Sequence, residues 1–254
     1  MRPNKKIHRQ EQITIEEKKM KLNPYSLYKI LLERFGDLDW WPIDRGYHEK
    51  NGSDPRFEIV VGAILTQNTA WSNVEKALGN LKSKNILDIK KLVDIDIVNL
   101  QNMIKPSGFF NQKAKRLKNL ALYLHNNYHD NLGTFFNREL YAIREELLSL
   151  SGIGTETADS IILYAGNLPI FVVDAYTKRI CERLPLCTNI SYNEIQHYFE
   201  EELSQIYSKE ELTQVYNELH ALIVILAKNH CKKKPECSTC PLKKHCMFKK
   251  CLTQ

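Results

Sequence analysis

The chain has 254 residues, 43% of them hydrophobic and 26% charged, and a formal net charge of +6. This length suits one large domain or two small ones with a sizeable core. It contains no run of about 18 apolar residues that could span a membrane, and its N-terminus lacks the apolar segment of a secretory signal. These features exclude a membrane-spanning or secreted class, and we expect a globular cytoplasmic protein.

Positive charge is concentrated in two places. Residues 228–250 contain eight lysines and one glutamate, a local charge of +7 that leaves the rest of the chain at −1. A second basic cluster has no acid between its ends and consists of Lys105, Lys113, Lys115, Arg116 and Lys118. Two basic patches on a nearly neutral body indicate a polyanionic partner.

The first part of the chain predicts a tail, a helix and a loop. Residues 1–22 are polar and charged, and we expect them to be disordered. Apolar residues at helical spacing from Asn23-Pro24 to Phe35 predict an amphipathic helix that Gly36 ends. The stretch Tyr47–Pro55 is polar and predicts a loop.

Two adjacent tryptophans, Trp40 and Trp41, precede Pro42 between these segments. They cannot both face one core from a helix. Either one is core while the other packs under a loop, or both help to wall a pocket for a flat ring, since aromatic faces stack on such rings. Composition alone does not choose between these interpretations.

A buried helix is predicted to begin at Arg56-Phe57-Glu58 and to end at the polar quartet Thr66–Thr69. Trp71 and a helix over Ser72–Leu81 follow, and residues 86–104 give further short helices. The turn at Pro106-Ser107-Gly108 leads into a basic helix. We expect its leucines to face inward and its lysines to face out.

A loop over 129–138 precedes the helix that leads to the stretch Leu147–Arg179. Here Gly152 and Gly154 allow backbone angles that other residues resist, and Thr155 and Thr157 are plausible caps for a second helix. Its buried face would carry Ala158, Ile161, Ile162 and Ala165. Free N–H groups at such a turn can hold a DNA phosphate. Taken alone, the glycine turn is more often a simple connection, and Asp174 is more often an N-cap.

The last third of the chain predicts helices through Leu184, over Tyr192–Phe199 and over Glu211–Leu226. Strand signals are weak throughout, so the sequence predicts an all-α fold. Cys181 and Cys187 look like ordinary buried thiols, and Cys251 is spare. The run Cys231-x5-Cys237-x2-Cys240-x5-Cys246 predicts a shared metal centre in a reducing compartment, either tetrahedral zinc or a four-iron cluster.

The run L-S-G-I-G-T-E-T-A-D followed by V-V-D resembles the helix-hairpin-helix base-excision glycosylases of the endonuclease III superfamily. The resemblance implies a six-helix barrel domain over 55–168 that contains the hairpin. It also implies a terminal-helix domain over 23–54 and 169–254, with the active cleft between the two. Many relatives carry a [4Fe–4S] loop at this end of the chain, which favours iron–sulfur over zinc. Their usual first gap is six residues rather than five.

The same resemblance implies roles for individual residues. Asp174 would be the catalytic carboxylate, and Gln67 would enter the gap that the flipped base leaves. The cluster ligands would be Cys231, Cys237, Cys240 and Cys246. The DNA-contacting residues are expected to be Gly152, Gly154, Thr155, Lys113, Lys115 and Lys178.

A narrower set of motifs resembles the 3-methyladenine DNA glycosylase branch: W-W-P, F-E-x-x-x-G-A-x-L-T-Q-N-T, P-S-G-F-x-N-Q-K-A-K-R-L and G-I-G-x-E-x-A-D. By this match Trp40, Trp41 and Trp71 would line the base pocket, together with Lys228. Members of this branch are monofunctional. Bifunctional relatives carry a lysine two residues after the second hairpin glycine, where this chain has Glu156.

We therefore expect a monomeric, monofunctional DNA N-glycosylase that removes a damaged base from double-stranded DNA. The expected base is an alkylated purine such as 3-methyladenine. The alternatives are a bifunctional glycosylase/AP lyase that acts on oxidised pyrimidines and a non-catalytic DNA-binding module.

Overall fold

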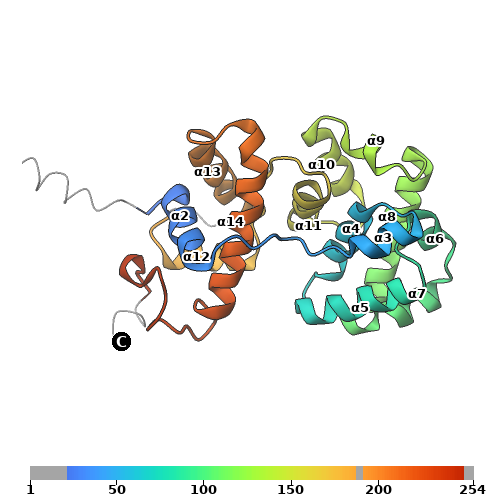
Figure 1. The fold of residues 1–254 in the computed structure, drawn as a ribbon, viewed down its shortest axis with the longest axis horizontal. Helices are drawn as coiled ribbons and strands as arrows, with labels where there is room; N and C mark the ends of the chain where they lie inside the picture. The colour runs from blue at the N-terminus through green and yellow to red at the C-terminus, as the bar shows by residue number, and fades with distance from the viewer. Residues whose placement is uncertain (1–21, 187–190, 249–254) are drawn as a thin grey trace, which may run out of the picture. The chain divides into compact units, whose positions relative to one another are not determined.

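The computed structural model describes residues 22–186 and 191–248, and all the regular elements within these ranges are helices (Figure 1). The all-α prediction is confirmed. The predicted N-terminal tail up to residue 21, Cys187 and Cys251 lie outside the described residues. Leu22, the last residue of that predicted tail, is buried. Within those same ranges, no helix has the length and apolar character that crossing a membrane requires.

The chain forms two compact units. We call Leu38–Asp174 together with Tyr207–Ala221 the hairpin unit. The terminal unit consists of the chain up to Asp37, Ala175–Ile206 and the chain from Leu222 onward. Helix α14 (Lys209–Asn229) contributes its first part to the hairpin unit and its remainder to the terminal unit.

The terminal unit begins with helix α2 (Pro24–Phe35), as predicted. Asn23 and Ser26 form a reciprocal capping box at its start, and Gly36 ends it with φ 72°. Helix α13 (Tyr192–Ser204) packs against both α2 and α12 (Ala175–Arg183). The cysteine loop follows α14 and contains the short helix η3 (Lys243–His245).

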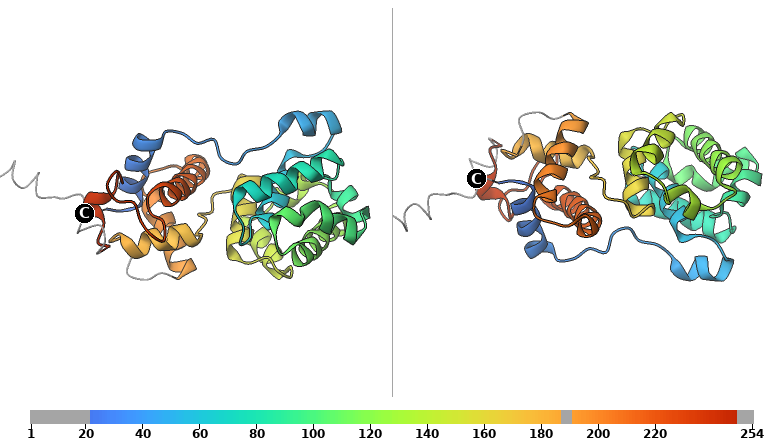
Figure 2. Two further views of the ribbon diagram at one scale, coloured as in Figure 1. Left: turned by 90° about the horizontal axis from the view of Figure 1, so that it is seen from below. Right: turned by 90° about the horizontal axis from the view of Figure 1, so that it is seen from above.

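The hairpin unit contains most of the helices. They are α3 (Arg45–Asn51), α4 (Pro55–Leu65), α5 (Trp71–Ser83), α6 (Ile89–Asp94), α7 (Ile97–Ile104), η1 (Lys105–Ser107), α8 (Phe110–Tyr128), α9 (Leu132–Phe136), α10 (Leu140–Ser149), α11 (Thr155–Ser160) and η2 (Ile161–Ala165). Helix α8 packs against α6 and α7, and α4 packs against α5, α8 and η2. Both views of Figure 2 show these green and blue-green helices gathered into one bundle.

Helix α4 is the central helix of this bundle. All its residues from Phe57 to Leu65 are buried, as expected for a helix that is apolar on nearly every side. Each of its fully buried aliphatic side chains contributes about 1.5–3 kcal/mol relative to an exposed one. A Cβ on Gly62 would lie 3.0 Å from the Trp41 ring. Glycine at this position therefore lets the tryptophan lie against the helix backbone.

Two predicted loops contain short helices instead. Within the stretch predicted as a loop over 47–55, helix α3 runs to Asn51, because the Asp44 side chain accepts a hydrogen bond from the Tyr47 N–H and Gly52 closes the end with φ 64°. Within 129–138, helix α9 begins where the Asn131 side chain accepts from the Thr134 N–H. Both loop predictions are wrong, because capping residues suffice to start helices too short to show an apolar period.

Candidate functional site

Helices α10 and α11 form the predicted hairpin, and a buried ion pair joins them. Asp159 is 0% exposed, and it accepts hydrogen bonds from Arg144 Nε at 2.6 Å and Nη2 at 3.1 Å. Such a two-bond pair fixes orientation as well as distance. The predicted buried face is confirmed, since Ala158, Ile161, Ile162 and Ala165 are all at most 3% exposed. The two helices are therefore held rigidly on either side of the turn.

The two hairpin glycines have different conformations. Gly152 has φ 84°, in the left-handed region, and a Cβ there would overlap the Arg116 side chain. Gly154 has φ −96°, which any residue adopts, and a Cβ there would meet no atom within 4 Å. The expectation that both glycines need unusual angles holds only for Gly152.

The predicted threonine caps are also wrong. Helix α11 begins after Gly154, and no side chain makes a cap hydrogen bond at its start. Thr155 is instead the first helical residue. Thr157 is buried, and its hydroxyl accepts a hydrogen bond from Gln67. Gly154, which precedes the first turn, has no side chain that could cap it, and a helix start of this kind suits an anion.

Gln67 is bonded to the hairpin rather than projecting freely from it. Its Nε2 donates to Gly152 O at 3.1 Å and to Thr157 Oγ1 at 2.9 Å. Its Oε1 accepts a short hydrogen bond from Arg116 Nη1. Arg116 of α8 thus connects the end of α4 to the hairpin turn. In the sequence, Arg116 is recognisable only as a member of a basic cluster, because this role depends on contacts between distant segments.

The predicted DNA-contacting lysines occupy different environments. Lys113 is 1% exposed, and its Nζ donates to Leu65 O at 2.8 Å and to Ser107 O at 2.7 Å. Burial, with a smaller contribution from Arg116, lowers the Lys113 pKa to about 8. The expectation that Lys113 faces outward is wrong, since it closes the end of α4. Lys115 is exposed as predicted. Lys178, on α12 in the terminal unit, has its Nζ 6.0 Å from the centre of the Tyr192 ring.

The three predicted pocket tryptophans form one cluster in the hairpin unit. The ring centroids of Trp40, Trp41 and Trp71 are 4.8–5.3 Å apart, with tilted or edge-to-face planes. A base between two parallel rings would separate their centroids by roughly 7 Å, twice a van der Waals contact. No such gap separates any two of these three rings, so a base would stack on an outer face of the cluster.

Asp174 lies at the end of the buried segment that follows the hairpin and is 8% exposed. Its Oδ2 lies 3.6 Å from Nε2 of His220, a residue of α14 that also belongs to the hairpin unit. His220 Nδ1 forms a 2.6 Å hydrogen bond with the hydroxyl of Tyr164. The Tyr164 ring in turn packs against Trp41, with centroids 5.2 Å apart. Asp174 is thus connected through two side chains to the tryptophan cluster.

Sequence reasoning missed both His220 and Tyr164. Each lies within an apolar helical run that reads as core, and 56 residues separate them. A histidine between the buried residues Leu219 and Ala221 was the only available signal. It could not identify a partner.

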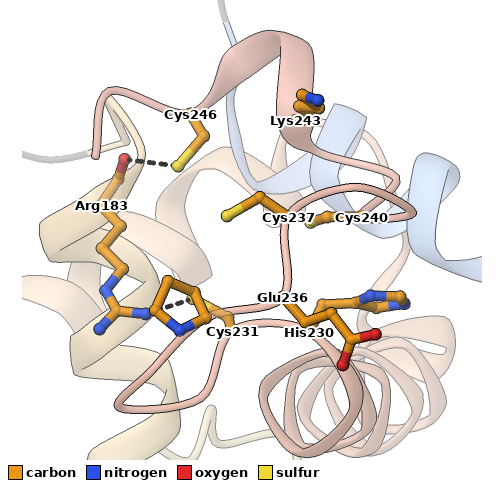
Figure 3. Close-up of a pocket in the computed structure, with 9 residues that line it drawn as sticks. Arg183, His230, Cys231, Glu236, Cys237, Cys240, Lys243 and Cys246 are labelled. Carbon is orange, nitrogen blue, oxygen red and sulfur yellow. Dashed lines mark hydrogen bonds between the residues drawn. The ribbon is translucent and has the colours of Figure 1, made fainter. Parts of the chain in front are cut away.

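The four cysteines of the C-terminal run line a single pocket in the terminal unit (Figure 3). Arg183 Nη1 donates to Cys231 Sγ at 3.2 Å, and Cys246 Sγ donates to Arg183 O at 3.6 Å. Burial, reinforced by the neighbouring thiols Cys231 and Cys246, raises the pKa of the Cys240 thiol. Cys181 is 2% exposed, in keeping with a buried thiol on α12.

Cys231, Cys240 and Cys246 are free thiols, whereas Cys237 is disulfide-bonded. With Cys237 reduced, the four sulfur atoms would suit a metal centre held by thiolates, since four sulfur ligands are what iron–sulfur clusters and structural zinc require. In residues 22–186 and 191–248, however, no three His, Cys, Asp or Glu side chains are arranged to hold a metal ion. The four cysteines thus match a thiolate-bound metal centre in the chemistry of their donor atoms but not in their arrangement.

Two further predicted positions are exposed. Glu156 lies in the first turn of α11, where bifunctional relatives carry a lysine. Lys228 lies in the last turn of α14, in the terminal unit, and is also exposed.

Comparison with known proteins shows the family to which the chain belongs. Residues 61–205 match the HhH-GPD superfamily base excision DNA repair protein model. A putative DNA repair glycosylase of Methanocaldococcus jannaschii is 43% identical over 230 residues, or 89% of this chain and 96% of that protein.

Two solved structures resemble the model over most of the chain. The H. pylori 3-methyladenine DNA glycosylase (MagIII) bound to 1,N6-ethenoadenine is 30% identical with a TM-score of 0.65, covering 82% of this chain and 98% of that one. A non-covalent endonuclease III–DNA complex has a TM-score of 0.69 and covers 91% of this chain and 96% of that one. At 23% identity, that likeness concerns the fold. The family match over more than half of the residues, together with the 43% identity, shows that this chain belongs to the HhH-GPD superfamily of base excision DNA repair proteins.

Proposed function

We propose that the protein is a monofunctional DNA N-glycosylase that excises alkylated purines, with Asp174 as its catalytic carboxylate. The observation that carries the proposal is the connection between Asp174 and the tryptophan cluster within one unit. A platform for a flat base and a carboxylate for the sugar are the two parts that base excision needs. A non-catalytic DNA-binding module would need neither.

The chemistry follows from the charge that develops on the sugar. As the bond between base and sugar breaks, the sugar becomes positively charged, and the Asp174 carboxylate would stabilise it or take a proton from the attacking water. An alkylated purine such as 3-methyladenine carries a positive charge and leaves readily. Tryptophan faces would bind that cationic base.

The absence of an amine at the hairpin supports a monofunctional reaction. A lyase step requires a nucleophilic amine that forms a Schiff base with the sugar. Glu156 occupies the position where lyases carry that amine, and a carboxylate cannot form an imine. The expected product is therefore an intact abasic strand.

DNA contacts would come from the hairpin and the basic patches. The start of α11, with Gly152, Gly154 and Thr155, would hold a backbone phosphate without reading sequence. Exposed Lys115, together with Lys178, would add charge contacts. Gln67 would fill the gap left by the flipped base, which requires it to exchange its bonds to Arg116, Gly152 and Thr157 for contacts with DNA.

We further propose that Cys231, Cys237, Cys240 and Cys246 hold a [4Fe–4S] cluster, with zinc as the alternative. Such a centre would supply folding free energy to the cysteine loop. Exposed Lys232, Lys233 and Lys234 would offset its negative charge and face DNA phosphates.

The substrate proposal rests on likeness to the H. pylori enzyme, whose structure was solved with 1,N6-ethenoadenine bound. It can be tested by measuring base release from duplexes that carry 1,N6-ethenoadenine and from methylated DNA that contains 3-methyladenine. We expect release by the wild type and a loss of about a thousandfold in Asp174→Asn.

Asp94→Asn is the matched control, because Asp94 is an exposed aspartate at the end of α6. An undamaged duplex controls for lesion dependence. Full activity of Asp174→Asn, or release of undamaged adenine at the same rate, would contradict the proposal.

A further inference from the structure

We propose that His220 is a positioning residue for Asp174, held by Tyr164 in the tautomer that carries its proton on Nε2. This inference rests on the proposed role of Asp174 and adds two residues to it. The three side chains come from distant parts of the hairpin unit: Tyr164 from η2, Asp174 from the segment after the hairpin, and His220 from α14.

The geometry forms a continuous chain of polar atoms. The Tyr164 hydroxyl lies 2.6 Å from His220 Nδ1, and His220 Nε2 lies 3.6 Å from Asp174 Oδ2. All three residues are 8% exposed. A buried polar chain of this kind is retained only when its members bind one another or a ligand.

The direction of the hydrogen bonds follows from the charges around Tyr164. Burial, followed by the nearby carboxylates Asp174 and Glu218, raises the Tyr164 pKa well above its usual value, so the phenol keeps its proton. A protonated hydroxyl can donate to Nδ1 or accept from it, and the Asp174 carboxylate beside Nε2 selects donation to Nδ1, with the imidazole proton on Nε2. The opposite tautomer would turn the Nε2 lone pair toward a carboxylate oxygen and would be repelled by it.

Nε2 of His220 is buried and has no hydrogen-bond partner among the described residues. At 3.6 Å the carboxylate lies just beyond a normal hydrogen bond, which needs a separation of about 2.7–3.2 Å. A shift of about half an ångström would close it, and catalytic hydrogen bonds commonly tighten when substrate binds. His220 is thus placed to bind Oδ2 of the Asp174 carboxylate.

Tyr164 lies in η2, which is a turn of π-helix. The Gly166 N–H bonds to Ile161 O five residues back, at 3.0 Å, which is the pattern of a π-helix. A Cβ on Gly166 would lie 2.6 Å from Ile162 O and 2.8 Å from the Phe136 ring, so the close approach requires glycine. Such wide turns often occur at functional sites.

Tyr164 also connects the carboxylate to the base platform. Its ring packs against Trp41 at 5.2 Å and against His220 at 5.9 Å. The other carboxylate near this chain, Glu218, accepts a hydrogen bond from the Leu38 N–H at 2.7 Å. Tyr164 therefore fixes the position of the His220 ring relative to the tryptophan that would carry the base.

The test compares single-turnover base release and duplex affinity for His220→Ala, His220→Gln and Tyr164→Phe. We expect His220→Ala to slow base release by about 10- to 100-fold, the usual cost of losing an outer partner of a reactive group, with the duplex dissociation constant unchanged. His220→Gln should restore most of the rate, because its amide N–H lies near the position of Nε2. Tyr164→Phe should have a smaller effect in the same direction.

The pH profile separates positioning from simple structural support. Without the Nε2 proton, the Asp174 carboxylate is less stabilised, so the acidic limb of the rate profile should move to higher pH in His220→Ala and return in His220→Gln. A thermal melt of each variant checks folding.

Asp174→Asn, run in parallel, keeps the two proposals distinct. Should Asp174→Asn retain base release, the proposed function itself is wrong. Should Asp174→Asn lose it while His220→Ala keeps both the wild-type rate and the wild-type acidic limb, the role of His220 is overturned. A slow His220→Ala that neither glutamine nor a pH change affects would also overturn it, since that pattern indicates only structural damage.

Discussion

In the hairpin region, protein groups bind one another: Gln67 bonds to Gly152, Thr157 and Arg116, and Asp159 pairs with Arg144. In the cysteine loop, four cysteine sulfur atoms surround one pocket, and those of Cys231 and Cys246 bond to Arg183. The first region is closed by its own hydrogen bonds, whereas the second is built around donors that suit an added group. The hairpin should therefore keep its structure without any cofactor, and the loop should not.

The largest effect should come from removing one proposed cluster ligand. Cys240→Ser, purified anaerobically, should lose its iron and its broad absorption at about 400 nm. Its terminal unit should also become sensitive to proteases. Cys181→Ser is the control, because Cys181 lies on α12 outside the run. A colourless wild type that contains stoichiometric zinc would replace the iron–sulfur proposal with a zinc loop.

The next effect separates the two hairpin glycines. Gly152→Ala should cost about 1–3 kcal/mol of stability, because alanine resists the left-handed conformation and its Cβ would displace Arg116. Binding to damaged and undamaged duplexes should weaken equally. Gly154→Ala should melt like the wild type, because Gly154 has an ordinary φ and open space. Equal destabilisation by both variants would show that the turn is held differently.

A third prediction concerns Glu146 of α10, which accepts hydrogen bonds from Arg138 at 2.6 Å, Tyr128 at 2.6 Å and Tyr123 at 2.7 Å. The hydrogen bond from Arg138 is the largest of the effects that lower the Glu146 pKa from 4.5 to about 2, and the two tyrosine bonds add to it. The stabilisation is therefore complete above pH 4.5 and lost as the pH falls toward about 2. Glu146→Gln should lower the free energy of unfolding by about 2 kcal/mol at pH 7, and urea melts should show this difference shrinking at pH 3. A constant difference would contradict it.

The smallest effect distinguishes two lysines of α8. Lys115→Gln should reduce the slope of log affinity against log salt by about 1, because one phosphate contact is lost. Lys113→Met should leave that slope unchanged, because Lys113 bonds to Leu65 O and Ser107 O inside the unit. A reduced slope in Lys113→Met would mean that Lys113 reaches DNA after all.

Local signals in the sequence predicted much of the fold. The apolar spacing up to Phe35, the glycine at 36 and the apolar run from Phe57 each depend on neighbours in the chain, and the structure confirms the helices that they predict. Helices α3 and α9 were not predicted, because their seven and five residues are too few to show the hydrophobic period of a helix.

The candidate site was predicted less completely, because its contacts join distant segments. Gly152, Gly154 and Asp174 belong to one recognisable run of residues, and Gln67 belongs to another. By contrast, the burial of Lys113 depends on Leu65, 48 residues away, and the Tyr164–His220 bond spans 56 residues. The spacing of apolar residues along the chain carries no information about contacts between residues that are so far apart in the sequence.

Borohydride trapping on abasic duplex tests the central claim, excision without strand cleavage, most directly. The wild type should give no covalent adduct, because Glu156 cannot form an imine, and base release should leave a strand that breaks only with alkali or heat. Lys178→Ala and Lys228→Ala are run beside it, since these two lysines are the amines that could substitute. A strong wild-type adduct that disappears in one of these variants would contradict the monofunctional account and identify the attacking residue.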